Sequence, residues 1–156
     1  MKKIKLDKGQ FTLVDDEDFE KLNKYKWHVM SVGYAGRTIG SEKRKNRKMV
    51  LMHRVIMETP KGFVTDHINR NKLDNRKKNL RTVSHAQNLW NMGLTKQNKL
   101  GCKGVRLFVN GKYVVSISIK NKQKHLGYFF TIEEAKKAYN DAVLKYRDEF
   151  SYMNNL

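Results

Sequence analysis

The sequence has little cysteine, little proline and no long hydrophobic run. Cys102 is the only cysteine, which excludes an internal disulfide and a zinc ribbon built from paired Cys-x-x-Cys motifs. No apolar segment approaches the roughly 18 residues that a membrane-spanning helix needs. The first residues, MKKIKLDKGQ, also lack the apolar core of a signal peptide. We therefore expect an intracellular, cytoplasmic protein that binds no membrane.

Acidic residues are scarce as well. The 156 residues include 33 Lys and Arg but only 15 Asp and Glu, which gives a formal net charge of +18. Such a chain is attracted to polyanions, so nucleic acid is the first partner to consider. Because 39% of the residues are hydrophobic, the composition is that of a folded chain and not of a basic disordered tail. The length suits one ordinary domain or two small ones.

The N-terminal part contains signals for short strands and one helix. Residues 2–14 hold two alternating runs on either side of Asp-Lys-Gly, which predicts a β-hairpin. The acidic residues 15–18 are typical of a helix start, where they complement the helix dipole, and a metal cluster is the alternative. Residues 27–30 and 34–37 predict two further strands, with Trp27 in the core.

Two basic features follow. Residues 41–48, SEKRKNRK, are typical of a solvated turn, and on so basic a chain they could also contact DNA phosphates. His53 and Arg54 lie inside the apolar run MVLMHRVIM. A histidine in that setting is usually structural, and the functional alternative is a phosphate contact beside an active site.

The most informative stretch runs from residue 63 to residue 91. Its apolar beginning predicts a strand that ends in Asp66 and His67. A polar, basic loop follows, and the segment LRTV then predicts a second short strand. Ser84 and Gln87 occupy the positions of a capping box, which predicts the start of a helix. The expected order is strand, loop, strand and helix.

Four polar side chains in this stretch form a candidate hydrolytic site. Asp66 and Asn88 offer hard oxygen ligands of the kind that suit Mg²⁺ or Mn²⁺. Asn88 lies about one turn into the expected helix, so its side chain leans back toward the end of the first strand. His67 can take a proton from water, and Asn79 can pin the loop and orient His67. The alternative is a polar loop rich in turn-forming residues, with a structural histidine.

The pattern changes after the polar segment 93–100. The segments GVRLFV, KYVVSISI and KHLGYFF predict three strands, the first two joined at Asn110-Gly111. Thr131 and Glu134 form a capping box for an amphipathic helix. That helix can cover one face of a three-stranded antiparallel sheet, and no segment remains to cover the other. We therefore expect an α+β fold.

The central pattern D-H-I-N-x-x-x-x-D-N-R-x-x-N-L-R, followed by Q-N-x-x-N, resembles the HNH endonucleases of the phage and homing type. This resemblance implies a strand-strand-helix metal fold around one divalent ion, Mg²⁺ or Mn²⁺. It implies that Asp66 and Asn88 bind the ion, that His67 activates the attacking water and that Asn79 holds the loop. The absence of cysteine pairs means that the additional zinc site of some HNH proteins is missing.

Most of residues 101–156 resemble the APETALA2-type DNA-binding domain of plant ethylene-response factors, through GVR, NGKY, LGYF and the helix EEAKKAYNDAVLKY. This resemblance implies that the three-stranded sheet lies in the DNA major groove. Several arginines and tryptophans of the plant proteins are replaced here, so their target sequence does not transfer. The expected DNA-binding residues are Lys103, Arg106, Phe108, Asn110, Ser116, Ser118, Gln123 and His125, together with Arg54 and Arg76.

These observations predict a nuclease domain over residues 1–95 and a DNA-binding domain over residues 96–156. The expected function is site-specific hydrolysis of double-stranded DNA with one divalent metal. We expect a monomer or weak dimer that nicks one strand, acting in the host-cell cytoplasm if it is phage-encoded. One alternative is a catalytically inactive DNA-binding regulator with the same two domains. Another is a basic RNA-binding protein.

Overall fold

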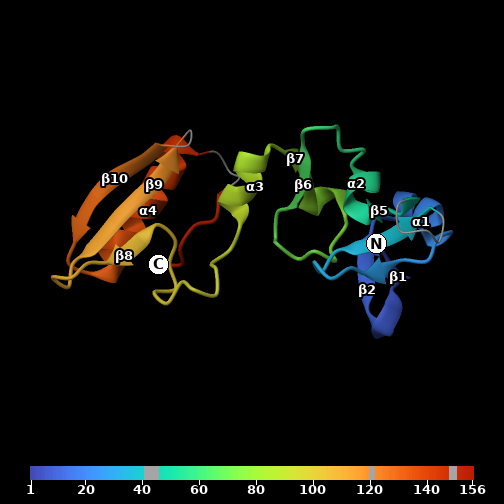
Figure 1. Ribbon diagram of the computed structural model, residues 1–156, viewed down its shortest axis with the longest axis horizontal. Helices are drawn as coiled ribbons and strands as arrows, with labels where there is room; N and C mark the ends of the chain where they lie inside the picture. Colours follow the sequence, from blue (N-terminus) through green and yellow to red (C-terminus); the bar gives the residue numbers. More distant parts are fainter. Residues whose placement is uncertain (41–45, 120–121, 148–150) are drawn as a thin grey trace. The chain divides into compact units, whose positions relative to one another are not determined.

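The computed structural model describes residues 1–40, 46–119, 122–147 and 151–156. The chain divides into two compact units, Met1–Asn88 and Leu89–Leu156, each with its own hydrophobic core. Figure 1 labels the helices and strands of both units. The predicted phosphate contact of the basic loop falls mostly on residues 41–45, outside the described residues.

The N-terminal unit is built from small antiparallel sheets and short helices. β1 pairs with β2, β4 pairs with β3 on one side and β5 on the other, and β6 pairs with β7. The elements are β1 (Lys2–Lys5), η1 (Asp7–Gly9), β2 (Phe11–Val14), α1 (Asp16–Asn23), β3 (His28–Val29), β4 (Ala35–Ile39), β5 (Lys48–Leu51), α2 (Met52–Ile56), β6 (Val64–His67), η3 (Lys77–Asn79), β7 (Leu80–Val83) and the beginning of α3 (His85–Asn91), within which the division between the units falls.

The local signals near the N-terminus are confirmed. β1 and β2 form the predicted hairpin, and Lys8 and Gly9 turn the chain with φ of 53° and 71°. The acidic run begins α1, where Asp16, Glu17 and Asp18 occupy the first turn and complement the helix dipole. The acidic residues 15–18 therefore mark the start of a helix, as predicted.

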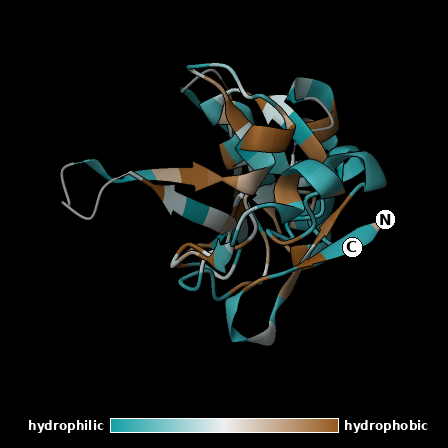
Figure 2. Cartoon of the chain, turned by 90° about the vertical axis from the view of Figure 1, so that its right-hand side faces the viewer, coloured by the Kyte–Doolittle hydropathy of each residue, from teal (hydrophilic) through white to brown (hydrophobic). Residues whose placement is uncertain are grey.

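The apolar run from Met49 to Met57 divides between two elements. β5 ends at Leu51 and α2 begins at Met52. The part of the run before Met52 therefore pairs with β4, and the part from Met52 onward packs into the core. In Figure 2, brown hydrophobic stretches alternate with teal hydrophilic ones along the strands and helices of the chain. The buried core residues are Ile4, Leu6, Val14, Leu22, Trp27, Ala35, Met52, Ile56 and Leu80.

The C-terminal unit is a three-stranded antiparallel sheet with one helix on one face, as the sequence predicts (Figure 1). The strand order is β10-β9-β8, so the hairpin strand β9 is central. The buried core between sheet and helix comprises Cys102, Val105, Val115, Ile117, Ala135, Tyr139, Ala142 and Val143. The elements are β8 (Val105–Leu107), β9 (Tyr113–Ile119), β10 (Lys122–Phe129) and α4 (Ile132–Tyr146).

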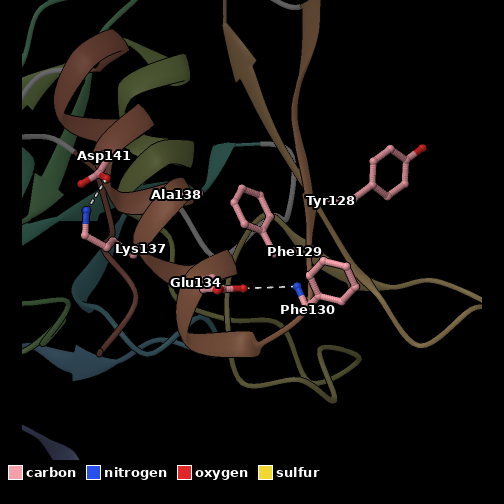
Figure 3. A pocket seen from close by; sticks show the side chains of 7 residues that line it. All are labelled: Tyr128, Phe129, Phe130, Glu134, Lys137, Ala138 and Asp141. Atoms are coloured by element: carbon pink, nitrogen blue, oxygen red, sulfur yellow. Dashed lines mark hydrogen bonds and ion pairs between the residues drawn. The ribbon is translucent and has the colours of Figure 1, made fainter.

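The start of α4 is fixed by the predicted capping box. The Thr131 hydroxyl accepts the backbone N–H of Glu134, and the Glu134 carboxylate accepts the N–H of Thr131. Figure 3 shows Glu134 also accepting the N–H of Phe130, beside a hollow between the end of β10 and α4. No helix in the described parts of the chain is both long and apolar enough to span a bilayer.

Candidate functional site

The end of β6 carries Asp66 and His67 on opposite faces of a two-stranded ribbon. β6 and β7 pair so that Asp66 lies opposite Arg81 and His67 opposite the core residue Leu80. The Asp66 carboxylate accepts hydrogen bonds from Nε and Nη2 of Arg81 at 2.9 and 2.8 Å. Both Asp66 and His67 are buried, with 7% and 4% of their surface exposed. The carboxylate is thus held by an arginine, and the imidazole contacts the side chains of Asn75, Tyr34 and His53.

A chain of hydrogen bonds fixes which nitrogen of His67 carries its proton. The Thr12 hydroxyl donates to the carbonyl of Leu73 at 2.8 Å, so its oxygen must accept the 2.7 Å bond from Nδ2 of Asn75. The Asn75 Oδ1 atom therefore faces His67 and accepts from Nε2 at 3.1 Å. In the neutral imidazole, Nδ1 is then the proton acceptor.

Two aromatic rings complete the surroundings of His67. The Tyr34 ring stacks on His67 at a centroid distance of 5.7 Å, and His53 meets the same imidazole edge-on at 5.1 Å. Tyr34 and His53 also contact each other at 4.8 Å. The ammonium of Lys72 lies 4.8 Å from the Tyr34 ring centroid. A cation, an aromatic wall and a second histidine therefore surround the candidate base.

Burial and neighbouring charges set the protonation of this cluster. Burial lowers the pKa of His67, although the bond to Asn75 and the charge of Asp66 act in the opposite direction. Burial, followed by the nearby His67 and Arg54, lowers the pKa of His53 to about 3. Burial and then the Asp66 carboxylate raise the pKa of Tyr34. Both histidines are thus neutral at pH 7, and Asp66 acts electrostatically on both Tyr34 and His67.

Asn79 holds the loop between β6 and β7. Its Oδ1 accepts the backbone N–H of Asn69 at 3.0 Å, and its Nδ2 donates to the carbonyl of Asp74 at 2.8 Å. Both contacts tie the Asn79 side chain to the backbone of this loop, and its role in the reaction stays a prediction. The hydrogen bond that orients His67, however, comes from Asn75, which the sequence analysis did not single out.

Asn88 is the fourth of the seven residues of α3, about one turn into the helix. The Gln87 N–H donates to the Ser84 hydroxyl, and the Ser84 N–H donates to the Gln87 side chain, which is the predicted capping box. The Asn88 N–H donates to the Ser84 carbonyl at 3.1 Å, so Asn88 lies in the first hydrogen-bonded turn. β7, which pairs with the strand of Asp66, leads directly into this helix.

Three of the basic side chains expected to contact DNA have partners inside the protein. Arg54 donates to the carbonyls of Phe63 and Thr59, and Arg76 makes a two-pronged ion pair with Asp74, with both N–O distances at 2.6 Å. Lys103 donates to three carbonyls at the end of α3, those of Leu89, Trp90 and Met92. These cations position segments of the fold.

The other expected DNA contacts lie on or beside the sheet face that α4 does not cover. Alternate residues of β9 face the core, and Ser116 and Ser118 point the other way. The strand register places Arg106 opposite Val114, His125 opposite Ser116 and Gln123 opposite Ser118 on that outer face. Phe108 and Asn110 lie exposed in the β8–β9 turn. The uncovered face thus carries hydroxyl, amide, imidazole and guanidinium groups.

Sequence reasoning missed several residues around His67. Thr12 and Tyr34 lie far from His67 in the chain, so no local spacing connects them to it. Asn75 belongs to the D-N-R pattern of the central stretch, which was the available signal. His53 was predicted from the sequence as either a structural histidine or a phosphate contact. Its burial beside His67 distinguishes it from an ordinary core histidine.

Comparison with known proteins identifies the family. Residues 50–89 match the HNH endonuclease family. The chain is 31% identical over 152 residues to an uncharacterized HNH endonuclease of Acanthamoeba polyphaga mimivirus, covering 96% of this chain and 77% of that protein. It is also 44% identical over 46 residues to Protein 3.8 of Escherichia phage T7, covering 30% of this chain and 38% of that protein. No solved structure matches the chain. With nearly its whole length aligned to an HNH endonuclease and its Asp66-His67 strand end inside the matched family segment, this chain is a nuclease of the HNH endonuclease family.

Proposed function

We propose that this nuclease is a site-specific DNA endonuclease with one divalent metal ion, Mg²⁺ or Mn²⁺, held near the end of β6. The observation that carries this proposal is the hydrogen-bonded chain from Thr12 through Asn75 to His67. It presents a neutral imidazole with Nδ1 as acceptor, next in sequence to a carboxylate. A base and an anionic oxygen ligand at one strand end are the two groups that metal-assisted hydrolysis requires.

The donor set fits a hard cation that keeps part of its water shell. Asp66 and Asn88 would hold the ion through oxygen atoms. The described residues contain no group of three or more His, Cys, Asp or Glu side chains that could form an all-protein cage. Such a site suits Mg²⁺, which is commonly held by one or two carboxylates together with waters and substrate phosphate oxygens. When bound, the ion would neutralise charge on the scissile phosphate and the departing oxygen.

The protein side chains have separate tasks in the proposed reaction. His67 takes a proton from water at Nδ1 while its Nε2–H stays on Asn75, so the imidazole keeps its orientation as it becomes charged. The water oxygen forms the new bond to phosphorus, and the bond to the 3′ oxygen breaks. Arg81 holds Asp66 from the neighbouring strand through its hydrogen bond and ion pair to that carboxylate.

The C-terminal unit is proposed to direct cleavage to a DNA site. We assign residues 1–95 to the nuclease domain and residues 96–156 to an APETALA2-like domain whose outer sheet face enters the major groove. Arg106 is the strongest candidate for a base contact, because arginine can donate two hydrogen bonds to guanine. One active site per chain favours a monomer or weak dimer that nicks one strand. Similarity to a protein of a phage supports action in a host cytoplasm.

The first experiment is cleavage of a DNA library with Mg²⁺, with Mn²⁺ and with EDTA, followed by mapping of the new ends. We expect cuts at one sequence class, in one strand, in the two metal reactions and none with EDTA. Tight DNA binding with no new ends in either metal would contradict the nuclease mechanism and favour the inactive regulator. A preference for RNA over duplex DNA would contradict the assignment of the substrate.

Thr12 offers a test of the hydrogen-bonded chain. We expect Thr12→Val to slow cleavage about tenfold, the lower range for removing a group that orients a catalytic ligand. The loss of the hydroxyl removes the oxygen acceptor of the buried Asn75 Nδ2, at a cost of roughly 1–3 kcal/mol in the free energy of unfolding, whereas the Leu73 carbonyl keeps its bond from the Leu13 N–H. Single-turnover rates and urea unfolding measure the two effects. Thr12→Ser keeps the hydroxyl and is the control, and equal rates for both variants would exclude the orienting role.

A further inference from the structure

The turn between β8 and β9 exposes a short apolar run. Leu107, Phe108 and Val109 are 57%, 49% and 98% exposed. The turn itself is closed, since the Phe108 N–H donates to the Lys112 carbonyl at 2.8 Å and the Gly111 N–H donates to the Phe108 carbonyl at 3.0 Å. Phe108 and Val109 are therefore held on an ordered backbone, where two large apolar side chains in water are unfavourable.

Neighbouring side chains support this turn from the outer face of the sheet. The ring of Phe108 meets Tyr128 edge-on at 6.1 Å, and Tyr128 contacts His125 at 4.9 Å. The ammonium of Lys112 lies 4.7 Å from the ring centroid of Phe130, which is itself 74% exposed. The ring of Tyr128 thus packs against Phe108. This contact would hold Phe108 in place if its side chain inserts into a partner.

The charge around the turn points to a polyanionic partner. Residues 99–132 contain seven Lys and Arg and no Asp or Glu. Arg106 and Lys112 lie on either side of the apolar run, and the outer face behind it carries hydroxyl and amide groups. An apolar centre with a cationic rim matches the stacked bases and phosphate backbone of DNA.

We propose that Phe108 and Val109 form a wedge that inserts between neighbouring base pairs and bends the DNA. This inference rests on the proposed contact between the C-terminal sheet and DNA, and it adds a deformation step that base contacts alone do not require. Apolar side chains inserted at a base step unstack it and kink the duplex by about 20–90°. Pyrimidine–purine steps are the easiest to open, so the wedge would favour sites that contain them.

The test uses the full chain carrying His67→Ala, which prevents cutting during the measurement. The probe is a 30-bp duplex of fixed sequence with central T-A steps, 2-aminopurine at one of those steps and a fluorophore pair at its ends, in about 50 mM salt. We expect binding to raise the 2-aminopurine fluorescence and to shorten the end-to-end distance. Adding Phe108→Ser with Val109→Ser should abolish both signals while lowering affinity by no more than roughly tenfold.

The matched control is Leu144→Ser, since Leu144 is 70% exposed on α4, away from the sheet. It should leave both signals unchanged. A bound duplex that stays straight and stacked, or a wedge variant that still bends it, would overturn the inference. If the apolar turn binds another protein and not DNA, the bound duplex would stay straight and stacked.

A third variant separates the wedge from the sheet contact on which it rests. We expect Arg106→Ala to weaken DNA binding and to leave the bend of each bound duplex intact. Unchanged affinity in that variant would count against the sheet contact. If the Phe108 and Val109 variant still bends DNA while Arg106→Ala weakens binding, the wedge is refuted and the contact between the sheet and DNA is not.

Discussion

Replacing His67 with Ala is expected to lower the rate of metal-dependent DNA cleavage by roughly 10²–10⁴, the usual contribution of a general base. The reason lies in the tautomer that Asn75 imposes, in which Nε2 carries the proton and Nδ1 is the basic nitrogen of the ring. Burial lowers the pKa of His67, so at pH 7 the imidazole is already neutral and able to act. DNA affinity should change little, because His67 is 4% exposed and offers no cation to the backbone. Single-turnover cleavage and a binding titration measure the two quantities.

A structural role for His67 would also reduce activity, and two further measurements exclude it. Alanine at this position leaves a space beside the rings of Tyr34 and His53, into which added imidazole can diffuse. We expect free imidazole to restore part of the rate of His67→Ala and to have no such effect on Thr12→Val. His67→Gln fills more of the space but cannot act as a base, so it should stay slow and unrescued. Cleavage by either His67 variant at the wild-type rate would remove His67 from the mechanism.

Much of this fold could be predicted because its local signals are strong. The hairpin around Lys8 and Gly9, the acidic start of α1 and the capping box of α4 each depend on residues close together in sequence. The run from Met49 to Met57 gave no such signal. Short apolar runs suit a buried strand and a buried helix equally, and here the chain changes from one to the other at Met52.

The candidate site was predictable only in its local part. Asp66 and His67 were expected at a strand end because the apolar run before them stops there. The bonds that orient His67 were not, because Thr12 is 63 residues from Asn75 and reaches it through the β1–β2 hairpin. A single sequence contains no spacing rule for such a contact. Asn75 itself looked like an ordinary turn-forming residue.

On the uncovered sheet face, one irregularity in β10 changes which residues point outward, so strict alternation along the strand predicts them incorrectly after it. Alternation along the last strand correctly places Gln123 and His125 on the outside, and continued without interruption it would place Gly127 there next. A bulge between His125 and Gly127 shifts the register, so Tyr128 lies opposite Val114 on the outer face. The aromatic support for Phe108 was therefore invisible before the strand pairing was known.

The second large effect is expected at Gly104, where we predict that alanine unfolds a substantial fraction of the C-terminal unit. A methyl group there would lie 2.2 Å from ring carbons of the buried Tyr139 and 2.8 Å from the Ser116 carbonyl. The backbone φ of 75° adds a conformational cost of about 1–2 kcal/mol. Overpacking a core contact costs roughly 1–3 kcal/mol more. Together these approach the few kcal/mol of stability expected for a unit of this size.

Gly101 provides a control in the same loop. Its φ of 67° imposes a similar backbone cost, yet a methyl group there would meet nothing within 4 Å. The free energy of unfolding should therefore fall by about 1–2 kcal/mol in Gly101→Ala, and the further loss in Gly104→Ala isolates the clash with Tyr139. Hydrogen exchange of the β9 amides measures this unit by itself, and exchange in β6 should not change. Equal effects of the two substitutions would mean that Tyr139 can move aside, so that this contact does not fix the position of β8 and the apolar turn that follows it.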